Sequence, residues 1–205
     1  MNKKLLFIAL STALGMTSAH AADTGFYVGG SFGQSRAADF NGSDVDAALA
    51  SLGITSRTTT DDTDTGWKVF AGYRIMKYLA VEGAYTNLGE ITAKTIATAP
   101  VAGTANTKLE NEAWTISAVG ILPLNDKFSL FARLGVNAWN MDASTTGTGS
   151  GTASVSSKDS GTNAVYGVGA GYSLTPNLNL RAEWERYDFG GDNIDFFSAG
   201  LAWVF

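Results

Sequence analysis

The sequence predicts an all-β fold, an eight-stranded antiparallel up-and-down transmembrane β-barrel, from three observations. Segments of about ten residues, the length of a membrane-crossing strand, alternate between apolar residues and polar or small ones. The apolar faces carry large and aromatic side chains, whereas the polar faces mix charges with glycine and alanine. Short turns near Lys77, Asn125 and Pro176 are separated by connections that are mostly long and polar. This asymmetry is typical of bacterial outer-membrane barrels.

The N-terminal segment, residues 1–21, has the pattern of a cleavable signal peptide. Two lysines precede an apolar run, and Ala19 and Ala21 supply small residues at positions −3 and −1 of a cleavage site. The apolar run is shorter than the about 18 residues of a membrane helix. We therefore expect residues 22–205 to be one exported β-barrel domain. The whole sequence has a formal charge of −5, and removal of the signal peptide with its two lysines leaves a domain with a formal charge of −7. This negative charge argues against nucleic-acid partners.

The first expected strand is followed by a long polar connection. Residues 25–34 alternate around a Gly-Gly pair that disfavours a helix. The connection 35–65 is polar, but residues 43–53 predict a short helix inside it, with Ser43 as N-cap and Gly53 just after its end. This helix would decorate a loop at the barrel rim.

An acidic run, Asp61-Asp62-Thr63-Asp64, ends the same connection and raises the question of a calcium site. A full EF-hand loop needs a ligand at its fifth position and a glutamate at its twelfth, and this run has neither. A solvated acidic loop is the preferred interpretation, and no metal site is expected.

The range 66–89, GWKVFAGYRIMKYLAVEGAYTNLG, has the pattern of a membrane-spanning hairpin. Its period of two fits strands with two different faces. Ten residues at about 3.3 Å each, tilted by about 40°, span close to 25 Å, the height of the apolar band of such barrels. A turn centred on Lys77 places Arg74 opposite Ala80 and on the same inward face as Glu82. The outward face is apolar, as contact with lipid requires.

This hairpin resembles the second and third strands of the OmpA-type transmembrane domain family, the eight-stranded barrels of Gram-negative outer membranes. The shared pattern is aromatic-Gly-Tyr-Arg, a short turn and Ala-Val-Glu-Gly-Ala-Tyr. The stretch AVGILPLNDKFSLFARLGV, at the second short turn, is also similar to that family. Members often carry a periplasmic peptidoglycan-binding domain after the barrel, and none is expected in this chain, whose last residue is Phe205.

Alternation predicts five more strands, and these cover residues 113–122, 128–141, 164–174, 178–187 and 194–205. The third of them contains alternating glycines with no helix after them, which argues against a dinucleotide-binding loop. Pairing across the turn at Pro176 places Gly169 opposite Glu183 and Gly171 opposite Arg181. The glycines thereby make room in the lumen for charged side chains. The connections 87–112 and 142–163 are expected to be polar loops.

The last strand carries an alternating apolar pattern, with Leu201, Trp203 and Phe205 on one face. This ending resembles the signal that the outer-membrane barrel-assembly machinery reads. The resemblance implies that machinery as a partner during biogenesis, and outer-membrane lipid and lipopolysaccharide as the surroundings of the barrel. The short turns are then expected in the periplasm and the long loops outside the cell.

Charged residues at inward positions predict a network in the lumen. Eight strands leave an interior that side chains can fill, and buried ions are costly unless paired. Arg74 is expected to pair with Glu82, or else with Glu183. The OmpA-type family carries such interior pairs, which the resemblance places at Arg74, Glu82, Arg133 and Glu183. The expected network comprises Lys68, Arg74, Glu82, Arg133, Arg181, Glu183 and Glu185.

The exported part of the chain offers little catalytic chemistry. The only histidine of the sequence, His20, lies in the predicted signal peptide, so the exported part has none, and the sequence contains no cysteine. Ser-His-Asp and Cys-His sites and the usual histidine-based metal sites are therefore excluded. No catalytic or cofactor site is expected, although Glu183 and Glu185 would be an acid/base pair for an enzyme if an open cleft led to them. A structural or surface-interaction barrel with external ligands on its loops is favoured, a narrow low-conductance pore is the alternative, and a lipid-modifying enzyme is less favoured.

Overall fold

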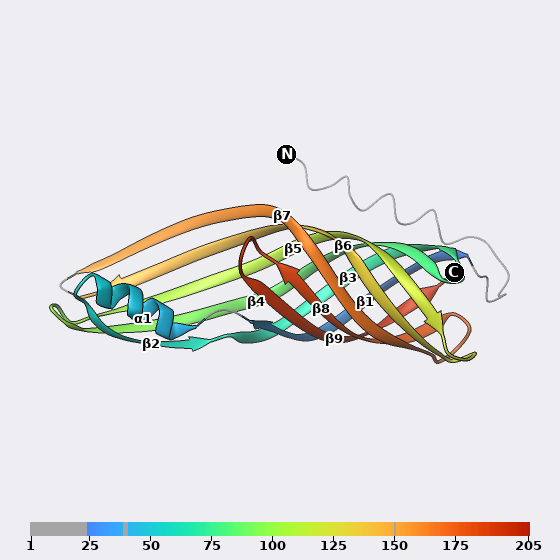
Figure 1. Ribbon diagram of the computed structural model, residues 1–205, viewed down its shortest axis with the longest axis horizontal. Coiled ribbons are helices and arrows are strands. Elements are labelled where there is room, and N and C mark those ends of the chain that lie inside the picture. The colour runs from blue at the N-terminus through green and yellow to red at the C-terminus, as the bar shows by residue number, and fades with distance from the viewer. Residues whose placement is uncertain (1–23, 39–40, 150) are drawn as a thin grey trace.

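The computed structural model describes residues 24–38, 41–149 and 151–205, so the predicted signal peptide with Ala19 and Ala21 lies outside the described residues. This part of the chain is almost entirely antiparallel strand (Figure 1). No helix within it is long and apolar enough to cross a membrane. Its elements are β1 (Gly25–Ala37), α1 (Gly42–Ser51), β2 (Thr55–Asp61), β3 (Thr63–Met76), β4 (Leu79–Ala99), β5 (Gly103–Pro123), β6 (Phe128–Thr148), β7 (Thr152–Ser173), β8 (Leu178–Asp188) and β9 (Asn193–Val204).

Eight of these strands close into a ring, which confirms the predicted barrel. Their order is β1-β3-β4-β5-β6-β7-β8-β9, and each pairs antiparallel with its neighbours. The ring closes where β9 pairs with β1, with Leu201 opposite Gly30. Closure leaves no strand edge inside the ring to meet lipid.

Side chains alternate between the lipid-facing surface and the lumen, with the apolar face outward. Along β3, for example, Val69 is exposed and Phe70 is buried. Aromatic rings gather on the outer surface at two levels. Near the short turns, Phe26 packs against Tyr73 and Phe128 against Tyr172 with tilted rings, whose centroids are 4.7 Å apart in both pairs. Nearer the other end, three rings form a row on neighbouring strands, and these are Trp67, Tyr85 and Trp114. Two such girdles mark the interfaces of a membrane barrel.

The prediction of polar loops at 87–112 and 142–163 is wrong, because most of these residues are strand. The hairpins β4–β5 and β6–β7 continue far beyond the ring and form the elongated half of the molecule (Figure 1). Glu90 pairs with Glu110 and Asp142 with Lys158 in these extensions. The residues are rich in threonine and serine on both faces, so a strand there shows no apolar alternation although threonine favours strands.

The predicted connection 35–65 also contains a strand, β2, which continues β3 and pairs with the outer part of β4. The expected helix is present as α1, but it begins at Gly42 with Asn41 as N-cap, whose side chain accepts a hydrogen bond from the Ser43 amide at 3.1 Å. Gly53 follows the helix with φ +77°, a conformation that suits glycine.

Helix α1 covers the outer edge of β2. Its Asp46 carboxylate accepts hydrogen bonds from the Thr58 amide at 2.9 Å and from the Thr58 hydroxyl at 2.7 Å. The opposite edge of the extended sheet differs. Pairing of β7 with β8 covers Val165–Ser173, and no described strand lies along the other side of residues 152–164. The sheet outside the ring therefore has one covered edge and one open edge.

Candidate functional site in the barrel lumen

Six charged side chains meet in the middle of the lumen, and they come from four strands. Lys68 lies on β3 and Glu82 on β4; Arg133 comes from β6; the remaining three come from β8. Each of the six side chains is at most 8 % exposed. We call this group the lumen ion cluster, and its members are Lys68, Glu82, Arg133, Arg181, Glu183 and Glu185.

Three glycines of β7 lie opposite the charged residues of β8. Gly169 lies opposite Glu183 and Gly171 opposite Arg181, which confirms the predicted register. Gly167 faces Glu185, and a Cβ atom at Gly167 would crowd the Glu185 side chain and the β8 backbone. A Cβ atom at Gly169 would instead meet the Phe131 ring, and one at Gly171 would meet Ser129 and Asn179.

Glu82 is the acceptor at the centre of one half of the cluster. Arg133 Nη2 donates to its Oε1 at 2.6 Å, and Arg181 Nη1 donates to its Oε2 at 2.8 Å. The Tyr27 hydroxyl, from β1, also donates to Oε2 at 2.9 Å. Three donors from three other strands thus hold one buried carboxylate.

The other half contains Glu183 and Glu185. Lys68 Nζ donates to Glu183 Oε2 at 2.8 Å and to Glu185 Oε2 at 2.6 Å. Arg133 bridges the halves, with Nη2 3.0 Å from Glu183 Oε2 and Nη1 2.8 Å from Glu185 Oε1. Arg181 Nε lies 2.8 Å from Glu183 Oε1. Three cations and three carboxylates balance, so the cluster carries no net charge.

Aromatic rings complete the seat of Arg181. Its guanidinium lies 4.5 Å from the centroid of the Phe70 ring and 4.6 Å from that of Phe131. Such contacts stabilise a desolvated cation. The sequence alone does not single out Tyr27, Phe70 and Phe131 as members of the site. Their inward positions in the alternation were the available signal.

The predicted pairing of Arg74 with Glu82 is wrong, and so is the second choice, Glu183. Arg74 lies opposite Ala80, as expected, but Glu82 is taken by residues from across the lumen. No ion pair or hydrogen bond to Arg74 is found among the residues that the structure describes. The pairing of residues on adjacent strands does not predict ion pairs between side chains from opposite walls of a narrow barrel.

An apolar layer lies between the ion cluster and the outer end of the barrel. Tyr187 and Phe196 are completely buried there, and the Tyr187 hydroxyl lies 3.0 Å from Thr86 Oγ1. Phe189, in the turn between β8 and β9, packs on Trp139 with ring centroids 5.3 Å apart. The outer end of the ring is therefore filled by packed side chains.

The remaining predicted residues lie on the surface. The β9 residues Leu201 and Trp203, and Phe205 just after them, are outward-facing and between 45 and 48 % exposed. In the acidic run, Asp62 Oδ2 lies 3.4 Å from Arg36 Nε, and Asp64 accepts hydrogen bonds from the amides of Thr65 and Glu90. No group of three metal-ligating side chains is found in the described residues.

Comparison with known proteins places nearly all of the chain in one family of sequences. The model of the outer membrane protein beta-barrel domain matches residues 5–205. Outer membrane protein A of Klebsiella aerogenes is 26 % identical over 194 residues, which cover 94 % of this chain and 50 % of that protein. The values for outer membrane protein A of Shigella flexneri are the same. The chain thus spans about half the length of these curated relatives.

Solved structures share the fold. OprG from Pseudomonas aeruginosa superposes with a TM-score of 0.57 at 16 % identity, over 91 % of this chain and 97 % of that one. Ail, the attachment invasion locus protein of Yersinia pestis, gives a TM-score of 0.51 at 15 % identity, over 89 % and 97 %. At this level of identity the likeness concerns the fold alone.

Proposed function

Since the chain belongs to the outer membrane protein β-barrel family, we propose that it has a structural or surface-interaction role in the outer membrane, with its lumen closed to solutes. The protein is an integral outer-membrane barrel, with its short turns in the periplasm and its long hairpins outside the cell. The observation that carries the proposal is the filled lumen, in which the neutral ion cluster lies beneath an apolar layer.

The narrow pore is the competing function, and two layers would have to open for it. Breaking a buried ion pair leaves an uncompensated charge, at a cost of about 3–5 kcal/mol. The lumen ion cluster contains several such contacts that share atoms, so one displaced side chain breaks more than one of them. The packed rings of Tyr187, Phe189 and Phe196 would also have to move.

Conductance in planar bilayers tests the closed lumen. We expect no discrete channel steps from the purified, folded protein, whereas a large porin in the same bilayer serves as the positive control. A triple variant opens both layers: Arg133→Ala removes three contacts of the lumen ion cluster, and Phe189→Ala with Phe196→Ala removes two rings of the apolar layer. Once inserted in the bilayer, this variant should conduct. Steady channels from the unaltered protein would overturn the proposal in favour of the pore.

The surface role is supported by the sheet outside the ring. The unpaired edge along 152–164 presents backbone N–H and C=O groups that can pair with an extended segment of another chain. The opposite edge is covered by α1 through Asp46 and Thr58. Residues 152–160 are exposed on both faces of β7, so the edge is reachable from outside.

A shortened hairpin tests this surface. Ala143 and Ser157 are paired, so residues 144–156 can be replaced by Asn-Gly, a two-residue turn suited to hairpins. We expect the variant to fold, as judged by altered gel mobility before boiling. Binding is measured on a panel of immobilised matrix and host-surface proteins. The variant should lose binding to the members of the panel that bind the parent protein. The matched control shortens β4–β5 by replacing 95–105. Equal binding by the parent and the shortened β6–β7 variant contradicts a role for this edge.

We also propose lipid, lipopolysaccharide and the barrel-assembly machinery as partners, a proposal that the family membership supports. The apolar outer surface and its aromatic girdles are suited to lipid and lipopolysaccharide. The outward-facing Leu201, Trp203 and Phe205 are the residues that we assign to recognition by the barrel-assembly machinery. The enzyme alternative has less support, because Glu183 and Glu185 are buried and held by Lys68 and arginines.

A further inference from the structure

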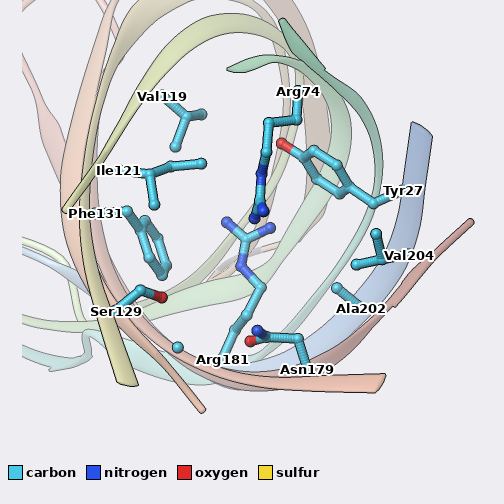
Figure 2. A pocket seen from close by; sticks show the side chains of 11 residues that line it. Tyr27, Arg74, Val119, Ile121, Ser129, Phe131, Asn179, Arg181, Ala202 and Val204 are labelled. Atoms are coloured by element: carbon cyan, nitrogen blue, oxygen red, sulfur yellow. The ribbon is translucent and has the colours of Figure 1, made fainter. Parts of the chain in front are cut away.

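A small cavity lies in the lumen between the ion cluster and the periplasmic turns. Its volume is about 50 Å³, and about 10–15 Å³ of such space holds one water molecule. The cavity thus has room for a few waters or one small ion. Figure 2 shows its wall, in which the polar side chains are Tyr27, Arg74, Ser129, Asn179 and Arg181.

Two guanidinium groups face one another across this cavity. Arg74 reaches in from β3 and Arg181 from β8, and their planar ends point toward each other in Figure 2. Arg181 uses Nη1 for Glu82 and Nε for Glu183. No ion pair or hydrogen bond of its Nη2 is found within the described part of the chain, so this group can serve a ligand. Arg74 has no ionic partner among the described residues. Two like charges brought together in a cavity repel, and an anion between them would remove that repulsion.

The balance of charges in the lumen also indicates an anion site at the cavity between Arg74 and Arg181. The lumen ion cluster is neutral without Arg74, so Arg74 adds one uncompensated positive charge to the lumen. Arginine presents a rigid fork of donors that matches the oxygens of phosphate and carboxylate. Ser129 and Asn179 add a hydroxyl and an amide to the wall. We propose that Arg74 and Arg181 bind one small oxyanion of the phosphate or sulfate class between them.

The ligand would enter from the periplasmic end. The cavity adjoins a wider mouth of about 570 Å³ formed by the short turns, which Arg74, Ser129 and Asn179 also line. Lys77 and Lys127 stand at this mouth with Asp126, so its charged side chains are mostly cationic. Such a balance attracts anions. The barrel wall separates the cavity from the surrounding lipid, which favours a free oxyanion over a phospholipid headgroup.

Titration of inorganic phosphate into folded protein in a phosphate-free maltoside detergent tests the site. Line broadening of the ³¹P resonance, measured at constant ionic strength, should saturate for the unaltered protein. Arg74→Gln should weaken binding at least about tenfold, equivalent to ~1.4 kcal/mol. Arg74→Lys should retain part of the affinity. Lys127→Gln, the matched control at the mouth, should change it less than about twofold. No saturable binding, or equal binding by Arg74→Gln, would overturn the proposal.

Resistance to urea supplies a second readout that does not depend on detecting bound phosphate. Without phosphate, Arg74→Gln should unfold at a higher urea concentration than the parent, because the facing charges are gone. Added phosphate should raise the midpoint of the parent and leave that of the variant unchanged. Equal shifts in both proteins would indicate a general salt effect and refute the site.

A parallel titration with glycerol 3-phosphate separates the two sources of phosphate. Weaker binding than that of the inorganic ion supports a free oxyanion in a closed cavity. Tighter binding would assign the site to a lipid headgroup and overturn the free-ion assignment. Both outcomes are independent of conductance, so failure of this proposal is distinguishable from failure of the closed-lumen proposal.

Discussion

Replacement of Glu82 should expose the strongest coupling in the barrel. Its carboxylate is completely buried and accepts hydrogen bonds from Arg133, Arg181 and Tyr27. Glu82→Gln keeps the volume and removes the charge, which leaves the lumen ion cluster with one excess cation. A buried pair broken in this way costs about 3–5 kcal/mol, and we expect the free energy of unfolding to fall by that amount.

A double-mutant cycle identifies the partner. Arg181→Met alone leaves an excess anion, but together with Glu82→Gln it leaves Lys68 and Arg133 against Glu183 and Glu185, which is neutral again. The double variant should therefore lose at least about 2 kcal/mol less than the sum of the single effects. Arg74→Met, which breaks no ion pair, is the comparison and should couple to Glu82→Gln by less than about 1 kcal/mol.

The assay is reversible urea unfolding in lipid vesicles, followed by tryptophan fluorescence. The result that refutes the reasoning is additivity of Glu82→Gln and Arg181→Met within about 0.5 kcal/mol, since residues in direct contact do not add. If the coupling energy of Glu82 with Arg74 is larger than that with Arg181, the Arg74–Glu82 ion pair expected from the sequence would be correct.

Three further predictions concern the wall, the last strand and the outer helix. Folded protein should resist SDS at room temperature and change gel mobility on boiling, because a closed sheet has no fraying edge; identical mobility would contradict closure. Phe205→Ala should lower the outer-membrane level more than Val204→Ala in fractionated cells, and equal losses would argue against an outward-facing assembly signal. Hydrogen bonds from the Thr58 amide and hydroxyl lower the pKa of Asp46. The contact of α1 with β2 should therefore persist above the unfolded pKa and weaken as acid protonates Asp46, measured as faster amide exchange in β2, whereas Asp46→Asn should show no such pH dependence.

Strand number, direction and inward parity could be predicted from the sequence, because a membrane imposes opposite chemistry on the two faces of each strand. The pairing of Gly169 with Glu183 and of Arg74 with Ala80 follows from that parity and from the short turns. The outer half of β4–β7 could not be found in this way. Most side chains there are polar and exposed or only partly buried, so a polar strand and a polar loop have nearly the same alternation signal.

Partners inside the lumen escaped prediction for a geometric reason. Parity tells which side chains point inward, but not their height or the direction in which they cross the barrel, and strand tilt sets both. Glu82 and Arg181 are separated by 99 positions in sequence and come together only because the ring closes. Arg74 points inward as expected, yet the partners next to it along the sheet are occupied by residues from the opposite wall.

The depth of a charged residue in the lumen determines whether its side chain must pair within the protein or can bind a ligand. Glu82 is cut off from water, so it must be satisfied by the protein itself, and its three donors leave no place for a ligand. Arg74 is only partly buried and lines the periplasmic mouth, where water can solvate its charge without an ion pair. An unpaired cation is tolerable there and remains available to an anion. The same barrel can thus keep a neutral, self-contained cluster at its centre and a cationic binding cavity at its periplasmic end.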